Sequence, residues 1–323
     1  MKLLLTSLFL CIFFTTSQAQ NFDVVDNKVR LYPKRYASAD ALATQIEKDF
    51  TKDIDRVRAV YTWLALNISY DLETLYNGET QINFSYTDQE DLQQKLKAIN
   101  THTINKTLRT KKAICEGYAQ TFKRVSELLG IPCLLVGGYS KGDVSDIGNA
   151  PQQENHAWNA VKINRKWYLI DATWGSGYTN GSKWIQHFND TFFFTNPDEF
   201  ILTHLPSEPE LAFTNNSVSK KEFYNAPLYE KAFFRNNLEL FSPLEGVLRA
   251  KPNSLIEFTL GNISENLELY YAFKGNRFST KIEPNCIDKK CTFNIPFTEN
   301  KNTELLIFAN KRTALQYKIK VKK

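Results

Sequence analysis

Apolar residues recur at helical spacing in the first third of the chain. Residues 42–50 repeat an apolar side chain every four positions, and residues 57–64 repeat one at i, i+3, i+4 and i+7. These patterns predict two helices, the second with Asp53 as a possible cap. A third helix is predicted over residues 88–100. The segment that precedes them, residues 21–36, has no such period, so we expect it to be irregular and extended.

The middle of the chain changes from helical to strand-like periodicity. An apolar stripe predicts a helix over residues 115–130, where a glycine ends it. The short apolar run 131–138 predicts a buried strand, and a polar loop follows it. Two more strands are predicted over 156–163 and 166–173, with a tight turn at 164–165 between them. Helices followed by neighbouring strands indicate an α+β core.

The last part of the chain consists of short strand-like runs separated by turn residues at regular spacing. This pattern begins at about residue 241 and is typical of a small all-β sandwich. Residues 213–240 are expected to form a helical connector. The predicted organisation is therefore a core over residues 20–212, the connector, and a β-sandwich domain over residues 241–323.

The N-terminus has the pattern of a secretory signal peptide over residues 1–19. Lys2 supplies the positive charge, residues 3–14 are apolar, and Ser17-Gln18-Ala19 offers small residues for cleavage. Twelve apolar positions are too few to cross a bilayer, which takes ~20. No other segment is long and apolar enough to be a transmembrane anchor. We expect an exported protein, periplasmic or extracellular.

Charge narrows the range of partners. The formal net charge is +5, from 40 basic and 35 acidic residues spread along the chain. Nucleic-acid binding would need a dense basic patch, so that class of function is excluded. Aromatic residues make up 13% of the sequence, which predicts cores rich in large rings.

Four cysteines follow the predicted signal peptide. Cys286 and Cys291 are close in sequence and are expected to form a disulfide in an oxidising compartment. Cys133 lies in an apolar strand and is expected to be a buried thiol. Cys115 has three interpretations at this point: a buried thiol, a disulfide with Cys133, or a free nucleophile.

The position of Cys115 favours the nucleophile. It starts a predicted helix, where free backbone N–H groups and the helix dipole favour a thiolate and could stabilise an oxyanion. A two-residue turn would make His156 and Asp171 diagonal neighbours on one sheet face, ~7–8 Å apart at the backbone. Asp171 would then orient the imidazole, whose other nitrogen would face the thiol. A turn longer or shorter by one residue would place the two side chains on opposite faces.

Three segments in this order resemble the transglutaminase-like superfamily. They are Cys115-Glu116-Gly117-Tyr118-Ala119, His156-Ala157-Trp158-Asn159 and Trp167-Tyr168-Leu169-Ile170-Asp171-Ala172-Thr173-Trp174. Upstream, Trp63 and Asn67-Ile68-Ser69-Tyr70-Asp71 are similar to a helix of the same core. Phe194-Thr195-Asn196-Pro197 and His204-Leu205-Pro206 are similar to the branch of kyphoscoliosis peptidase and cytokinesis proteins.

This resemblance implies a papain-like α+β core, followed here by an immunoglobulin-like β-sandwich. It implies Cys115 as nucleophile, His156 as general base and acid, and Asp171 as the group that orients His156. It implies a protein or peptide substrate and no cofactor. No acidic cluster resembles the calcium sites of animal transglutaminases, and no metal site is expected. Trp158 is a candidate for substrate contact, whereas we expect His204 to be structural.

The function expected from these features is thiol-dependent acyl transfer on amide bonds, carried out by a secreted enzyme. The branch that the chain resembles favours hydrolysis, as a peptidase or amidase, over transglutaminase cross-linking. The alternative is a catalytically inactive secreted binding or scaffold protein that retains the core.

Overall fold

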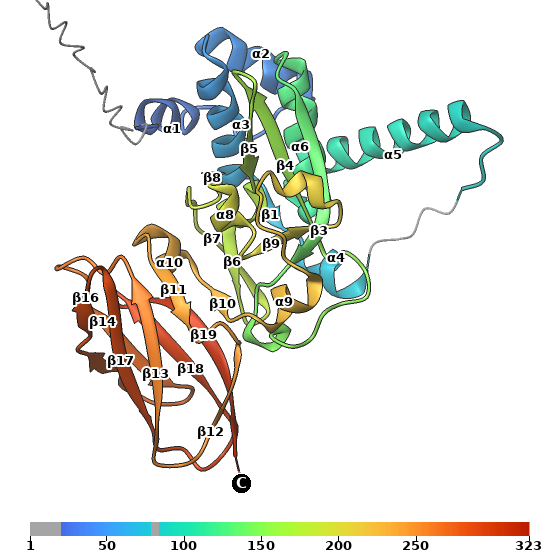
Figure 1. The fold of residues 1–323 in the computed structure, drawn as a ribbon. Helices are drawn as coiled ribbons and strands as arrows, with labels where there is room; N and C mark the ends of the chain where they lie inside the picture. Colours follow the sequence, from blue (N-terminus) through green and yellow to red (C-terminus); the bar gives the residue numbers. More distant parts are fainter. Residues whose placement is uncertain (1–20, 79–83, 323) are drawn as a thin grey trace, which may run out of the picture.

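The computed structural model describes residues 21–78 and 84–322, which form a helix-and-sheet core followed by a β-sandwich (Figure 1). The signal peptide predicted for residues 1–19 lies outside the described residues. Within these two ranges, no helix combines the length and the hydrophobicity that crossing a membrane requires.

An antiparallel sheet forms the centre of the core, and five strands of the described chain make it up, in the order β8-β5-β4-β3-β9. Residues of its central strand β4 are buried on both faces, because helices cover one face and side chains that include Phe192, Phe200 and Phe213 cover the other. The strands are β3 (Cys133–Ser140), β4 (His156–Ile163), β5 (Lys166–Ile170), β8 (Phe193–Thr195) and β9 (His204–Pro206).

Helix α6 packs directly on β3 and β4, and its apolar stripe faces the sheet. Tyr118, Phe122 and Val125 on this stripe are almost fully buried. Helices α2, α3 and α5 pack around α6, and α1 packs on α3 (Figure 1). The helices of this layer are α1 (Asp23–Val29), α2 (Ala39–Asp49), α3 (Asp53–Asn67), α4 (Leu72–Asn77), α5 (Gln89–Thr110) and α6 (Cys115–Leu128).

Short elements connect and extend the core. Among them, β1 pairs in parallel with β2 directly before α6, and α7 follows β5. The bounds are β1 (Ser69–Tyr70), β2 (Lys112–Ala113), η1 (Val144–Asp146), α7 (Ala172–Ser176), β6 (Gly177–Asn180), β7 (Lys183–Gln186), α8 (Pro197–Phe200) and η2 (Pro209–Ala212).

The C-terminal part is an immunoglobulin-like sandwich of two sheets around a separate apolar core. One sheet has the order β10-β19-β18-β14-β15, with β12 also paired to β19, and the other has the order β11-β13-β17-β16. The strands are β10 (Leu228–Tyr229), β11 (Glu239–Ser242), β12 (Val247–Ala250), β13 (Ser254–Gly261), β14 (Leu269–Phe273), β15 (Thr280–Ile282), β16 (Asn285–Ile287), β17 (Lys290–Phe297), β18 (Thr303–Ala309) and β19 (Arg312–Val321).

Three expectations about the core are corrected. Residues 21–36 contain helix α1, which Val25 and Val29 anchor in the core although no sequence period marks it. The helix expected over 88–100 continues to Thr110 as α5. Lys52 rather than Asp53 is the residue that precedes α3.

The connector over residues 213–240 is mixed rather than helical. It contains α9 (Lys220–Asn225) and α10 (Lys231–Arg235), but also β10 and the start of β11, which join the two sheets of the sandwich. Both strands are short, and β10 pairs with β19 near the end of the described chain, so the local sequence carries little signal for them. The domain boundary at residue 241 stays a prediction.

Candidate active site

Cys115 is the first residue of α6, and the paired strands β1 and β2 place it there. Tyr70 pairs with Ala113, two residues before Cys115, so the start of the helix is tied to the end of α3. The Cys115 side chain is half-buried and its thiol is free. The position at the first turn of a helix agrees with the expectation from the sequence.

The β4–β5 hairpin has the predicted register. Asn159 pairs with Ile170, and the turn residues Asn164 and Arg165 have φ of 50° and 68°. These left-handed values fit a two-residue turn that matches the twist of the strands. Strand β5 ends at Ile170, however, and not at Thr173 as expected, because the Asp171 side chain caps α7.

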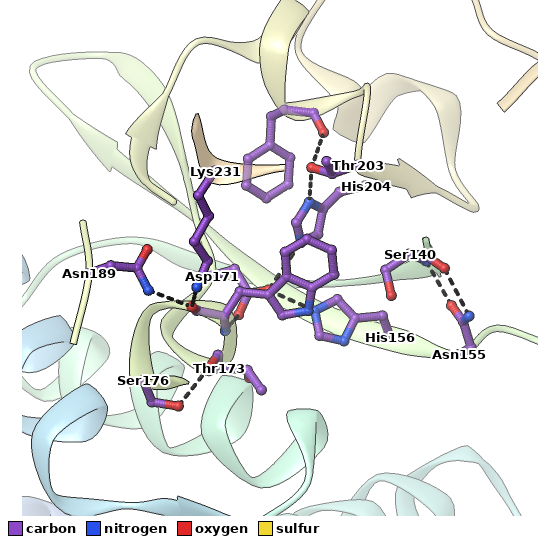
Figure 2. A network of polar contacts seen from close by, with 12 residues as sticks. Ser140, Asn155, His156, Asp171, Thr173, Ser176, Asn189, Thr203, His204 and Lys231 are labelled. Atoms are coloured by element: carbon purple, nitrogen blue, oxygen red, sulfur yellow. Dashed lines mark hydrogen bonds and ion pairs between the residues drawn. The ribbon is translucent and has the colours of Figure 1, made fainter. Parts of the chain in front are cut away.

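Asp171 and His156 meet as predicted, although Asp171 lies just beyond the strand. His156 Nε2 and Asp171 Oδ2 are 2.7 Å apart (Figure 2). The other carboxylate oxygen, Oδ1, accepts a hydrogen bond from the backbone N–H of Trp174 at 3.0 Å. Both side chains are buried, with Asp171 only 1% exposed. The carboxylate is therefore held at both oxygens, and it leaves His156 Nδ1 as the nitrogen that can face a thiol.

The electrostatics of this pair favour a charged imidazole. Burial lowers the pKa of His156, but the charge and hydrogen bond of Asp171, together with the Cys115 thiol, raise it to about 10. Burial raises the pKa of Asp171, but His156 and His204 hold it well below its usual range. Because Cys115 contributes to the raised pKa of His156, the three predicted residues lie close to one another.

The disulfide alternative for Cys115 is excluded by the same arrangement. Cys115 and Cys133 are both free, and Cys286 and Cys291 form the expected disulfide across β16 and β17. Burial raises the pKa of Cys133 to about 12, as expected for a core thiol. Of the two free cysteines in the described residues, Cys115 is therefore the more accessible one.

Tyr70 is a neighbour of Cys115 that the sequence did not single out. Its hydroxyl interacts with both the backbone N–H and the side chain of Cys115. Burial, and next the charge of Cys115, raise the pKa of Tyr70, so the hydroxyl stays protonated. A backbone N–H and a phenol O–H thus lie near the thiol, and both are groups that can donate a hydrogen bond to an oxyanion.

His204 is the second residue that sequence reasoning left out of the site. Its Nε2 lies 3.0 Å from the same Asp171 Oδ2 that binds His156, and its Nδ1 lies 2.8 Å from Thr203 Oγ1. The expectation that His204 is merely structural therefore misses a direct contact with the site. It lies 33 positions after Asp171, and only the pairing of β9 with β3 brings it back to the sheet.

The ligand atoms of His156, Asp171 and His204 lie within 4.8 Å of one another, a spacing that could hold a metal ion. The contacts fit hydrogen bonds better. Two ligands of a tetrahedral zinc at 2.0–2.1 Å would be ~3.3 Å apart, whereas His156 Nε2 and Asp171 Oδ2 are separated by 2.7 Å. We therefore assign these contacts as hydrogen bonds.

Trp174, rather than Trp158 as expected, is the tryptophan that lies beside the site with part of its surface exposed. Trp158 is only 1% exposed and packs on Phe200 and His204, which places it behind the site, where a substrate cannot reach its ring. Trp174 is half-buried, and its ring lies 5.8 Å from that of His156. Trp174 is therefore the aromatic residue that covers the His156–Asp171 pair.

The turn that carries Asp171 is supported by contacts from outside the sheet. The carbonyl of Trp174 accepts hydrogen bonds from Asn189 Nδ2 at 2.9 Å and from Lys231 Nζ at 3.3 Å, as Figure 2 shows. Lys231 belongs to α10, so the connector reaches the candidate active site. Tyr70 and His204 stood within segments that the resemblance had marked; for Asn189 and Lys231 the sequence carries no signal, because only tertiary contacts place them.

Comparisons with known proteins match the core of this chain to one family. The family model of the transglutaminase-like superfamily matches residues 40–172. Kyphoscoliosis peptidase of Mus musculus is 32% identical over 253 residues, which cover 74% of this chain and 34% of the mouse protein. Cytokinesis protein 3 of Schizosaccharomyces pombe is 24% identical over 236 residues, which cover 70% of this chain and 24% of that protein.

Among solved structures, a titin I27 domain mutant matches 26% of this chain and 88% of its own, with 16% identity and a TM-score of 0.21. The chain spans about a third of the length of the kyphoscoliosis peptidases that it matches.

Proposed function

Residues 40–172 belong to the transglutaminase-like superfamily, and we propose on that basis that the protein is a thiol-dependent acyl-transfer enzyme. Its substrates are amide bonds of proteins or peptides. The observation that carries the proposal is the placement of a free thiol at a helix start, close to a buried histidine that a carboxylate holds. A nucleophile, a proton carrier and an orienting group are the parts that such chemistry requires.

In the first half of the proposed reaction, the Cys115 thiolate attacks the carbonyl carbon of the amide. The new C–S bond places negative charge on the carbonyl oxygen, beside the Cys115 N–H and the Tyr70 hydroxyl. His156 then gives its Nδ1 proton to the leaving amine as the C–N bond breaks. Asp171 stays ionised and keeps the imidazole in place.

The second half decides the reaction class, because the acyl group can pass to water or to an amine. With water, neutral His156 takes a proton from the attacking molecule, the C–S bond breaks, and a carboxylic acid leaves. With a lysine amine the same steps would give a cross-link. We favour hydrolysis, since the name kyphoscoliosis peptidase describes a peptidase among the relatives.

The test is to trap the acyl-enzyme. The protein is incubated with an amide-mimicking, thiol-directed probe, and the labelled residue is identified by mass spectrometry. We expect the label on Cys115, and its loss in Cys115→Ala. Cys133→Ala is the matched control, because Cys133 is the other free cysteine within the described residues and is buried.

Label that stays unchanged in Cys115→Ala would contradict the proposal. A native protein that the probe does not label at all would favour the inactive scaffold instead. To separate hydrolysis from cross-linking, a labelled peptide is offered with and without an added primary amine. If the amine is incorporated into the peptide in preference to release of the free acid, the protein is a cross-linking enzyme and not a hydrolase.

We further propose that the protein works in an oxidising compartment outside the cytoplasm. The Cys286–Cys291 disulfide supports this location, because disulfides persist where thiols are not kept reduced. Fractionation of the expressing cells, followed by detection of the protein outside the cytoplasm, is the measurement that checks it.

A further inference from the structure

We propose that His204 is a positioning residue of the candidate active site, where its neutral imidazole donates Nε2–H to Asp171 and fixes the carboxylate for His156. The inference rests on the proposed function, because it assigns His204 a part in the same reaction. It rests physically on hydrogen-bond geometry, on burial, and on the different surroundings of two histidines that share one oxygen.

The Asp171 carboxylate is fixed from three directions. Oδ2 lies 2.7 Å from His156 Nε2 and 3.0 Å from His204 Nε2, while Oδ1 accepts the Trp174 N–H at 3.0 Å. The carboxylate is buried, so water cannot replace a missing donor without opening the site. Without the His204 donor, Oδ2 would face an aromatic wall on that side, and the carboxylate would be free to rotate away from His156.

The partners of His204 select its tautomer. Burial lowers the pKa of His204 to about 4, and the charge of His156 adds to this, while Asp171 opposes it. A neutral imidazole has one N–H donor and one acceptor nitrogen. With Nε2–H directed at Asp171, Nδ1 must accept. The Thr203 hydroxyl has one proton and two acceptors within reach, His204 Nδ1 at 2.8 Å and the Phe200 carbonyl at 3.2 Å, and we assign the proton to the nearer one, Nδ1. In this arrangement Thr203 donates a hydrogen bond to His204, and His204 donates one to the Asp171 carboxylate, which also binds His156.

Different surroundings give the two histidines different tasks. His156 also faces Cys115, so it has a second charged neighbour that favours the imidazolium. His204 is enclosed by rings instead: Phe200 stacks on it at 4.1 Å, and Trp174 lies at 4.6 Å. Two titratable groups whose environments push their pKa values apart take separate roles. His156 carries the proton, and His204 remains a fixed donor.

Packing is the alternative explanation for His204, since the aromatic enclosure would also suit a ring without a donor. Two substitutions separate the explanations. His204→Gln keeps an N–H donor near the Nε2 position but loses the stacked ring. His204→Phe keeps a stacked ring but loses the donor. A positioning role therefore predicts that Gln is the better replacement, whereas a packing role predicts the opposite order.

The readout is the rate at which chloroacetamide alkylates Cys115 in the native protein, measured as a function of pH. We expect His204→Phe to lower the rate by about 10- to 100-fold near pH 6, as misplacement of a catalytic group does. In the pH–rate profile of His204→Phe, we also expect the apparent pKa on the alkaline side to fall toward the usual histidine value of about 6.5. His204→Gln should stay within about threefold of the parent. Equal rates in both variants, or a faster Phe variant, would overturn the positioning role.

A second measurement uses the unsubstituted His204 and needs no activity. In ¹⁵N-histidine-labelled Cys115→Ala protein, NMR reports the tautomer and charge of His204 directly. We expect neutral His204 with its proton on Nε2 from about pH 5 to about pH 8. A proton on Nδ1, or titration near the usual histidine pKa, would overturn the inference. The two proposals can fail separately. If alkylation of Cys115 in the parent shows no assistance from His156, the proposed function fails. If NMR still gives the expected tautomer in that case, the assignment of His204 as a fixed donor stands.

Discussion

At the scale of single residues, the candidate site depends on how each polar group is satisfied away from water. Asp171, His156 and His204 are buried together, and each one has a hydrogen-bond partner inside the protein. Such a network is costly if one member is lost, because the remaining groups cannot turn to solvent. The chemical differences between its members therefore come from their neighbours rather than from exposure.

The pH dependence of the His156–Asp171 pair is one consequence. His156 has a folded pKa of about 10, above its usual 6.5. The stability that its protonation contributes is therefore fully present below about pH 6.5 and is lost as the pH rises toward about 10. We expect the difference in Tm between the parent and Asp171→Asn to be large near pH 6 and to shrink toward pH 10. Thermal melts across this range check it, and a difference that grows with pH would contradict the charged pair.

Tyr70 gives a prediction that concerns the reaction itself. If its hydroxyl stabilises the oxyanion, Tyr70→Phe should lower kcat by about 100-fold and leave KM nearly unchanged, because the contact exists only when charge develops. Steady-state kinetics on a peptide amide provide the measurement. Tyr76→Phe is the matched control, since Tyr76 lies on nearby α4 and is 64% exposed. A Tyr70→Phe enzyme with unchanged kcat would remove the hydroxyl from the mechanism.

At the scale of elements, the site depends on how closely β3, β4 and β9 approach one another. Gly138 pairs with His156 on one side and with Pro206 on the other, so it sits between the two strands that carry the histidines. A Cβ atom at this position would lie 2.8 Å from Pro206 Cα and even closer to the Leu205 carbonyl oxygen. Those obstacles are backbone atoms, which cannot move without separating β3 from β9.

Gly138→Ala should therefore destabilise the protein by about 2 kcal/mol or more, as overpacking against a rigid neighbour does. The adjacent Gly137 is the matched control, because a Cβ there would meet only the carboxylate end of the Glu154 side chain, which can move. We expect Gly137→Ala to cost less than about 1 kcal/mol. Urea unfolding of both variants measures the difference, and equal costs would show that the β3–β9 approach is not close enough to exclude a methyl group.

The elements also show how far local patterns determine the fold. The β4–β5 register follows from a two-residue turn, which is a local feature, so the meeting of His156 and Asp171 could be predicted. Helix α1 could not, because its burial depends on Asp26 binding Arg58, 32 positions away. His204 could be marked by resemblance but not placed, since the pairing of β9 with β3 is non-local.

At the scale of the whole molecule, the sandwich and the core are joined by lysines that donate to core carbonyls. Lys318 Nζ from β19 donates to the carbonyls of Ser145 at 2.8 Å and Ile147 at 2.6 Å. Lys231 Nζ from α10 donates to the carbonyl of Trp174. Of these acceptors, only the Trp174 carbonyl lies on the turn that carries Asp171. The two contacts therefore separate attachment of the sandwich from support of the candidate active site.

A truncation after residue 240 would test this division poorly, because it cuts strand β11 and removes the β19 partner of β10. Substitution of the two lysines leaves the chain whole. Lys231→Met should slow alkylation of Cys115 by about two- to tenfold, the effect of one hydrogen bond worth ~0.5–1.5 kcal/mol. Lys318→Met should lower Tm, because two carbonyls lose their donor, yet leave the alkylation rate unchanged. Lys318→Met could instead slow the alkylation of Cys115 as much as Lys231→Met does. In that case the sandwich supports the site through its whole interface rather than through α10, and the core does not act independently of the sandwich.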